Sequence, residues 1–285
     1  MTYVLQLAED PHFRFDESLL RSLHFMMIGH DLSKHPGRWR PGAVYVRNGA
    51  TGEVVYKGPD PDLVPGLVAE LVESVNAPDD THALVPAAMA HLNLVLIHPF
   101  SDGNGRMARC VQTLILAREA ILEPTFASIE EYLGRNTQTY YDVLAAVGQG
   151  HWHPENDTRP WLRFSLTAHL RQARTQLARV KESEQLWERC SVEAQSARLP
   201  ARVIPVLFNT ALGFRAQRSA YRALVDEEVS EAMATRDLRA MADAGLLVAH
   251  GEKRGRFYTA SVELRASARE IRGQRQLQAA ADPFA

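Results

Sequence analysis

Apolar residues recur at three- and four-residue spacing through much of the first 180 residues, the pattern of helices with one buried face. This pattern predicts helices over residues 15–32, 64–75, 84–97, 105–119, 129–147 and 159–180. Asp16 stands near the start of the first helix, where a carboxylate can cap it. Two alternating runs, 43–47 and 53–57, flank Asn48 and Gly49 and predict a β-hairpin among the helices.

The hydrophobic pattern changes in the last third of the chain. Charged, helix-prone residues 173–199 predict a connecting helix, and helical runs follow at 202–212, 214–224 and 230–245. Two apolar strands then lie on either side of Gly251–Gly255. We therefore expect a mainly α protein with four regions: a helical domain over 1–172, a linker helix over 173–199, a second domain over 200–265 and a C-terminal tail over 266–285.

Composition narrows the class of protein. The 285 residues are 46% hydrophobic and 23% charged, which is typical of globular domains, and the net charge of -2 gives no global attraction to nucleic acid or anionic membranes. Cys110 and Cys190 have no disulfide or zinc spacing. The N-terminus does not resemble a signal peptide, and residues 84–97 are too short to span a bilayer. We expect a cytoplasmic protein with no membrane partner.

Candidate chemistry concentrates in His98–Arg109, HPFSDGNGRMAR, directly after an apolar helical run. Gly103–Gly105 open the next helix, where unpaired N–H groups and the positive end of the helix dipole favour anions. Asp102 supplies the hard oxygen that suits Mg²⁺ beside phosphates, and His98 can exchange a proton near neutral pH. Each fragment alone is commoner as a turn, but together they predict a polyphosphate site with a base.

The segment HPFSDGNGRMAR resembles the Fic-domain signature HxFx(D/E)GNGRxxR at every defined position. The resemblance extends over about residues 15–172 and includes PGRWRPG, YKGPDP and IEEYLGRNTQTYYDVL. It implies a Fic-type helical bundle with a small β-hairpin flap. It also implies a protein adenylyltransferase, which moves AMP from Mg-ATP to a Ser, Thr or Tyr hydroxyl of a target protein and releases pyrophosphate.

By this resemblance, His98 would deprotonate the target hydroxyl and Asp102 would hold Mg²⁺. Arg106 would help to position the phosphates, and Arg109 would contact the γ-phosphate. The ATP-binding residues implied by the family are Asp102, Gly103, Asn104, Gly105, Arg106, Arg109, Tyr140 and Tyr141. Phe100 is expected to anchor the loop in the core.

Two further segments gain a role from the resemblance. A flap of Val54, Val55, Tyr56 and Lys57 would dock the target protein as an added strand; the alternative is an ordinary surface hairpin. Tyr140 and Tyr141 would line the nucleotide pocket; the alternative is a pair of core aromatics. The sequence departs from the family at Gly148–Gly150, where relatives often have an asparagine.

A second departure concerns regulation. Many relatives carry an inhibitory helix, [S/T]xxxE[G/N], whose glutamate pairs with the second arginine of the signature. Here the Ser/Thr-xxx-Glu match is Thr259–Glu263, followed by Leu264, and we reject it. We expect Arg109 to be free and the chain not to inhibit itself. A partner inhibitor or antitoxin protein, a missing N-terminal region, or control elsewhere remain open.

The C-terminal region resembles a winged helix-turn-helix. Its strongest segment is ATRDLRAMADAGLL, with Leu238 and Met241 inward and Gly245 ending the helix. Contacts to DNA phosphates would come from Arg236, Arg239, Lys253, Arg254 and Arg256. The alternative is a protein-binding or dimerisation module, so a homodimer stays open.

Two functions therefore compete. The first is the adenylyltransferase with an accessory winged helix. The second is a DNA-binding transcriptional regulator whose Fic part senses nucleotide. The intact His98 and Asp102 favour the enzyme, because a nucleotide sensor needs no base.

Overall fold

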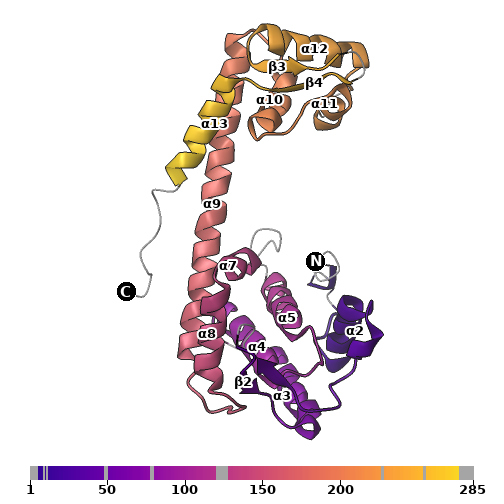
Figure 1. The fold of residues 1–285 in the computed structure, drawn as a ribbon, viewed down its shortest axis with the longest axis vertical. Helices are drawn as coiled ribbons and strands as arrows, with labels where there is room; N and C mark the ends of the chain where they lie inside the picture. Colours follow the sequence, from indigo (N-terminus) through magenta and orange to yellow (C-terminus); the bar gives the residue numbers. More distant parts are fainter. Residues whose placement is uncertain are drawn as a thin grey trace. The chain divides into compact units, whose positions relative to one another are not determined.

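The computed structural model describes residues 6–8, 10, 12–47, 51–77, 80–119, 128–225, 228–252 and 255–275. They divide into two compact units, one ending at Arg174 and one beginning at Thr175 (Figure 1). Both units consist mainly of helices, with one two-stranded sheet in each, so the predicted fold class is confirmed. Among the described residues, no helix combines the length and apolarity needed to cross a membrane.

The first unit consists of helices and one short hairpin. Its elements are α2 (Glu17–Ile28), η1 (Leu32–Lys34), β1 (Tyr45–Arg47), β2 (Val54–Lys57), η2 (Pro61–Leu63), α3 (Val64–Asn76), α4 (Leu84–Ile97), α5 (Asn104–Arg118), α7 (Glu130–Arg135), α8 (Thr137–Gly148) and the first part of α9 (Arg159–Ser196). The Asp16 side chain caps α2 by accepting a hydrogen bond from the N–H of Leu19, as its position predicts.

Helix α4 is the centre of this unit. It is apolar on all sides, as a helix surrounded by protein must be. Leu94 and Ile97 pack with residues of α2, α3 and α5 in one hydrophobic cluster, whereas Leu92 and Leu96 pack with β2, α8 and α9 in another. The chain that leaves the end of α4 is therefore fixed from two sides.

The predicted hairpin is confirmed: β1 and β2 are antiparallel, with Val46 opposite Tyr56. Two contacts attach it to the helices. The Tyr56 hydroxyl donates to the carbonyl of Leu96 at 2.7 Å, and the N–H of Lys57 donates to the carbonyl of Gly150 at 2.8 Å. The expected turn at Asn48 and Gly49 lies outside the described residues.

Two boundaries differ from the sequence prediction. Helix α9 begins at Arg159 and continues without a break to Ser196, so the linker expected at 173–199 is the second half of a 38-residue helix. The boundary expected at 265 falls inside α13 (Val262–Arg275), where Leu264 and Ala268 are buried. Both differences arise because apolar positions at helical spacing continue across the expected boundaries.

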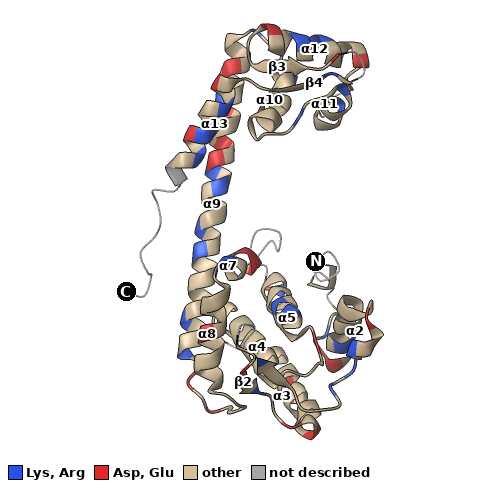
Figure 2. Ribbon diagram, viewed as in Figure 1, with Lys and Arg blue, Asp and Glu red and all other residues tan. Residues whose placement is uncertain are grey.

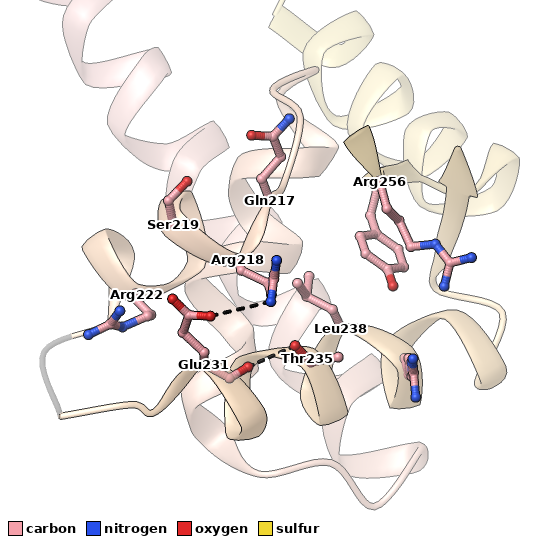
Figure 3. A pocket seen from close by; sticks show the side chains of 10 residues that line it. Gln217, Arg218, Ser219, Arg222, Glu231, Thr235, Leu238 and Arg256 are labelled. Carbon is pink, nitrogen blue, oxygen red and sulfur yellow. Dashed lines mark hydrogen bonds and ion pairs between the residues drawn. The ribbon is translucent and has the colours of Figure 1, made fainter. Parts of the chain in front are cut away.

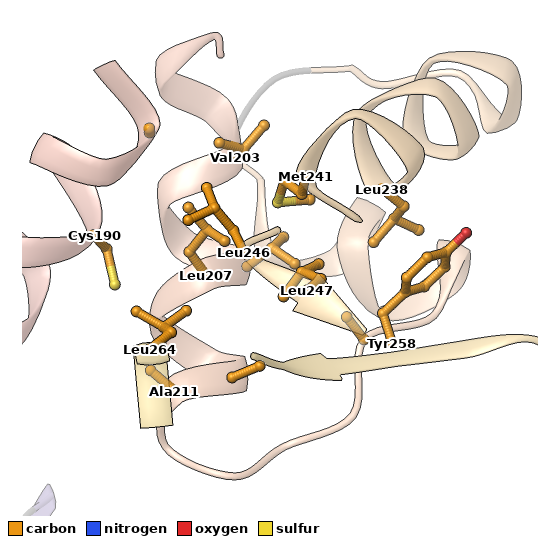
Figure 4. Packing of buried hydrophobic residues seen from close by; sticks show 14 of the residues in the cluster. Cys190, Val203, Leu207, Ala211, Leu238, Met241, Leu246, Leu247, Tyr258 and Leu264 are labelled. Carbon is orange, nitrogen blue, oxygen red and sulfur yellow. The ribbon is translucent and has the colours of Figure 1, made fainter. Parts of the chain in front are cut away.

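The second unit has its own hydrophobic core (Figure 4). Its elements are the end of α9, η3 (Ala201–Val203), α10 (Ile204–Ala211), α11 (Arg218–Leu224), α12 (Glu231–Asp243), β3 (Leu247–His250), β4 (Phe257–Ala260) and α13. Strands β3 and β4 are antiparallel, and Ala216 forms an additional bridge to Tyr258.

Helix α12 is held at both ends and in the middle. Ser230 caps it, and Gly245 (φ 73°) ends it, with the N–H of Leu246 donating back to the carbonyl of Met241, as a Schellman motif requires. The buried carboxylate of Asp237 accepts hydrogen bonds from Arg202 at 2.7 Å and from the Tyr221 hydroxyl at 2.8 Å. These bonds fix which face of α12 remains exposed, and Arg236 and Arg239 lie on that face.

Candidate active site

The segment that carries the candidate chemistry begins where α4 ends. His98 follows Ile97 in the left-handed conformation (φ 52°). Pro99 comes next, and a residue before proline disfavours the right-handed helical conformation, so the helix stops here. A left-handed residue with a Cβ costs roughly 1–2 kcal/mol, which the surrounding contacts must offset. His98 is thereby turned away from the helix and lines a cavity.

The loop after His98 is closed by a single amide side chain. The Asn104 Oδ1 atom accepts from the N–H of Phe100 at 2.9 Å, and its Nδ2 donates to the carbonyl of Phe100 at 2.8 Å. The Phe100 side chain is fully buried, as expected for the loop anchor. Since Asn104 uses its side chain inside the loop, only its backbone N–H remains for a phosphate.

The side chain of His24 on α2 contacts the same loop and holds it in place. This role was not predicted from the sequence. Its ring stacks on Phe100 with centroids 3.8 Å apart. Nδ1 accepts the N–H of Gly37 at 2.9 Å, so Nε2 carries the proton and donates to the carbonyl of Asp102 at 3.0 Å. Burial lowers the pKa of His24, which keeps the ring neutral in this arrangement.

Arg40 supports the other end of the loop and was also missed. The guanidinium is buried and donates to the carbonyls of His98 (2.8 Å), Gly42 (2.6 Å) and Pro59 (2.5 Å). The N–H of Arg40 also donates to the carbonyl of Pro99. These bonds fix the backbone of His98 in its strained conformation. The segment PGRWRPG, in which Arg40 stands between two turns, was the indication of this role in the sequence.

The geometry assigns the protonation of His98. The carbonyl of Val95 lies 3.1 Å from Nδ1 and can only accept, so Nδ1 carries the proton and Nε2 has the free lone pair. Burial is the main cause that lowers the pKa of His98, and the charge of Arg40 lowers it further, whereas the Val95 hydrogen bond and the charge of Asp102 raise it by less than burial lowers it. His98 is thus a neutral imidazole near pH 7, in the form that can accept a proton.

Helix α5 begins with the features expected of an anion site. Gly103 has a φ of 81°, which favours glycine, and a Cβ there would lie 3.0 Å from Ile28 Cδ1, so the isoleucine side chain would have to shift slightly. The first helical hydrogen bond runs from the N–H of Met107 to Gly103. The N–H groups of Asn104, Gly105 and Arg106 therefore have no acceptor within the helix.

The carboxylate of Asp102 lies beside this helix start. Its Oδ1 accepts the N–H of Gly103 at 2.6 Å and lies 3.7 Å from Arg106, and both side chains are about half exposed. The described residues contain no group of three or more His, Cys, Asp or Glu side chains that could hold a metal ion. One carboxylate still fits Mg²⁺, because this ion commonly takes one or two protein carboxylates plus phosphates and water.

A cavity of about 640 Å³ brings the predicted residues together. His98, Gly105 and Arg109 line it from the signature, Val55 and Tyr56 from the hairpin, and Tyr140 and Tyr141 from α8. Arg47 of β1 also lines it and was not predicted. Asp102, Gly103, Asn104, Arg106, Val54 and Lys57 are not among the lining residues.

Within the flap, and between the two tyrosines of α8, some side chains are exposed and others are buried. Val54 and Val55 are exposed, whereas Tyr56 is buried and hydrogen-bonded, so its side chain anchors the hairpin. Gly148 packs closely against the hairpin, because a Cβ there would lie 3.2 Å from the Tyr56 ring. Tyr141 is 56% exposed at the cavity, and Tyr140 is buried in its wall.

Arg109 has one weak ion-pair partner, and the expectation that it is free to bind phosphate stays a prediction. Its Nε lies 3.7 Å from Oε1 of Glu130, the first residue of α7. The glutamate side chain is 59% exposed, and an ion pair this long and this exposed contributes only about 0–1 kcal/mol. Glu130 therefore competes only weakly with an incoming phosphate.

The second unit has a cationic cavity of about 650 Å³ between α11, α12 and β4 (Figure 3). Four arginines line it with a single carboxylate: Arg218, Arg222, Arg239, Arg256 and Glu231. Glu231 pairs with Arg218 at 3.3 Å, which leaves an excess of positive charge, and basic residues mark α11 and α12 in Figure 2. Arg236 is exposed on α12 but does not line the cavity, and Lys253 and Arg254 lie outside the described residues.

Residues 14–116 match the model of the Fic/DOC family. The chain is 30% identical over 151 residues to a protein adenylyltransferase Fic of Nematostella vectensis and 32% identical over 147 residues to one of Culex quinquefasciatus. These alignments cover 50% and 51% of this chain but only 29% and 26% of the relatives.

A similar fold occurs in a solved structure. The crystal structure of a Fic family protein from Desulfovibrio desulfuricans G20 is similar to this chain with a TM-score of 0.55 and 22% identity. The match covers 92% of this chain and 73% of the other. At this identity the likeness shows the fold alone.

Buried histidines near the cavity should make folding depend on pH. Burial lowers the pKa values of His91 and His169 to about 4. An unfolded histidine takes up a proton near pH 6.5, so the unfolded chain binds more protons between pH 6.5 and 4. The free energy of unfolding should therefore fall as the pH falls through this range. Urea unfolding of His169→Gln, which removes one such group, should show a slope shallower by up to about 1.4 kcal/mol per pH unit. Ser165→Ala on the same helix is the control, and equal slopes for His169→Gln and wild type would contradict the assignment.

Proposed function

We propose that this protein is an adenylyltransferase that moves AMP from ATP to a Ser, Thr or Tyr hydroxyl of a target protein. The observation that carries the proposal is the cavity where His98, Gly105, Arg109 and Tyr140 meet the flap. The relatives named protein adenylyltransferase Fic support it, although the chain covers less than a third of their length.

The chemistry follows from the assigned proton positions. The free Nε2 of His98 accepts the proton of the target hydroxyl as its oxygen attacks the α-phosphorus. The bond from the α-phosphorus to pyrophosphate breaks, and the pyrophosphate leaves with the bonding electrons. The N–H groups at the start of α5 and the guanidinium of Arg109 offset the charge on the phosphates, and they are fixed before the reaction begins.

The proposal also gives roles to Mg²⁺, to the backbone at the start of α5 and to the flap. Mg²⁺ held by Asp102 would neutralise phosphate charge. Gly103, Asn104 and Gly105 would contact phosphate through backbone N–H groups, and Arg106 would assist from the helix surface. Val54, Val55 and the backbone of Lys57 would dock the target as an added strand, because the Val54 and Val55 side chains are exposed on the hairpin.

Removal of the His98 imidazole should reduce AMP transfer without weakening ATP binding. His98→Ala should reduce AMP transfer by about 10²–10⁴-fold, which is the usual contribution of a general base. ATP affinity should be retained, because His98 holds no phosphate. The measurement is transfer of label from ATP labelled at the α-phosphate, together with ATP titration of both proteins. Label that moves from γ-labelled but not from α-labelled ATP would overturn the proposal.

We propose DNA binding as a second function, carried by a winged helix-turn-helix in the second unit. The arginine-lined cavity supports it, because guanidinium groups without an equal number of carboxylates attract phosphates. Arg239 and Arg256 would contact the DNA backbone, with Arg236 beside them on α12. In the competing form of this proposal, the protein is a transcriptional regulator whose Fic part only senses nucleotide.

The DNA proposal predicts a specific salt dependence. Arg239→Ala/Arg256→Ala should weaken duplex binding and reduce the slope of log affinity against log salt by about 2, because two phosphate contacts are lost. Arg265→Ala/Arg269→Ala on α13 is the matched control with the same change in charge. Equal salt slopes in both variants, or a change of oligomeric mass without DNA binding, would favour an interaction module instead.

Other expectations from the sequence stay predictions. These are a homodimer, a partner inhibitor or antitoxin protein and a cytoplasmic location. Thr259 and Glu263, the rejected inhibitory match, belong to the second unit, on β4 and at the start of α13. That Glu263 does not control Arg109 likewise stays a prediction.

A further inference from the structure

One face of α8 lines the cavity of the first unit with exposed side chains. This face consists of Gln138, Tyr141, Asp142 and Ala145. Their spacing of three and four residues places them on the same side of the helix. All four are exposed, so a ligand in the cavity can contact them directly.

A single hydrogen bond joins Gln138 to Asp142 on this face. The Gln138 Nε2 atom donates to Asp142 Oδ1 at 2.8 Å. A carboxylate can only accept, so the amide nitrogen must face Asp142, and the amide cannot turn over without losing this bond. The pair therefore fixes the polarity of the amide. Its Oε1 atom and its second N–H have no partner among the described residues.

The charges around the cavity indicate how a nucleotide would lie in it. The N–H of Gly105 and the guanidinium of Arg109 attract phosphates at the start of α5. Among the described residues that line the cavity, Asp142 is the one carboxylate, and it would repel phosphates. Arg47 of the hairpin donates to the carbonyl of Gly52 at 2.9 Å. The uncharged base of a nucleotide therefore belongs at α8.

The surroundings of the base leave the Gln138 amide to distinguish one base from another. The Tyr141 ring is 56% exposed and offers a stacking surface, which any base can use. Thr137 donates to the carbonyls of the preceding turn, and the Tyr140 hydroxyl lies 3.1 Å from His91 Nε2. These two hydroxyls are therefore engaged within the protein.

An amide with fixed polarity matches adenine. The 6-amino group of adenine donates and its N7 accepts, and a glutamine amide can form both bonds at once. Here Oε1 of Gln138 would accept from the amino group, and the second N–H of Nε2 would donate to N7. A base with a carbonyl at position 6 would place two acceptor oxygens against each other, and Asp142 prevents the amide from turning over.

We propose that Gln138 selects adenine in this cavity and that Asp142 is a positioning residue, which fixes the Gln138 amide for this contact. The inference rests on the proposed function, since it places the base of ATP at α8. It deepens that function by naming the group that distinguishes ATP from other nucleoside triphosphates.

The test compares ATP with inosine triphosphate, which has a carbonyl in place of the 6-amino group. The wild type should bind ATP more tightly by about 5- to 150-fold, the range expected for one bidentate base contact. Gln138→Leu removes the amide and should bring the ratio of the two affinities close to 1. Both affinities are measured by calorimetric titration of the full chain.

Asp142→Asn tests the fixed polarity of the amide. Asparagine can donate as well as accept, so the Gln138 amide could take either orientation. The ratio should fall, mainly because inosine triphosphate binds more tightly. Glu131→Gln is the matched control with the same change in charge. Glu131 accepts from the amide of Gln172 at 3.2 Å, and neither residue lines the cavity, so the ratio should stay as in the wild type.

A further variant separates base selection from binding in general. Tyr141→Leu removes the stacking surface, so it should weaken the binding of both nucleotides alike and leave the ratio unchanged, because stacking tolerates any base. A change of the ratio in Gln138→Leu together with an unchanged ratio in Tyr141→Leu would support selection by the amide.

The outcomes distinguish this inference from the proposed function. If the wild type binds neither nucleotide, the proposed function fails. If the wild type binds inosine triphosphate as tightly as ATP or more tightly, or if Gln138→Leu keeps the wild-type ratio, selection of adenine by Gln138 is overturned. If Gln138→Leu lowers the ratio but Asp142→Asn keeps it, the positioning role of Asp142 is overturned.

Discussion

The side-chain amide of Asn104 hydrogen-bonds both backbone polar groups of Phe100, and the arrangement of the site depends on this closure. The two bonds tie the end of α4 to the start of α5 across a loop that contains Asp102 and Gly103. With Phe100 buried, the loop cannot shift without exposing an aromatic ring. The closure therefore fixes the separation between the base, the carboxylate and the N–H groups of α5.

Most side chains that surround the loop hold its backbone in place. His24 and Arg40 bond to backbone carbonyls on the two sides of the loop, and neither lines the cavity. The left-handed His98 is stable because Arg40 and Pro99 constrain its backbone. A site for a highly charged ligand benefits from such rigidity, since its dipoles need little reorganisation when charge moves in the reaction.

The sequence predicted the parts of this site that depend on local order. The spacing of His98–Arg109 indicated a helix start with glycine, carboxylate and arginine in fixed positions, and the hairpin followed from alternation beside Asn48-Gly49. Contacts between distant residues could not be predicted: His24 reaches Asp102, and Gln112 reaches His169, across many intervening positions. Glu130 was missed for the same reason. The extent of α9 was missed although no glycine or proline interrupts the chain between Trp161 and Ser196, a feature that favours one continuous helix.

The central claim is that this cavity cleaves ATP between the α- and β-phosphates. The most direct measurement is phosphorus NMR of the products when the full chain is incubated with Mg²⁺, ATP and a protein substrate, or with itself. The account predicts pyrophosphate in an amount equal to the AMP retained on protein. Release of ADP or inorganic phosphate in place of pyrophosphate would contradict it.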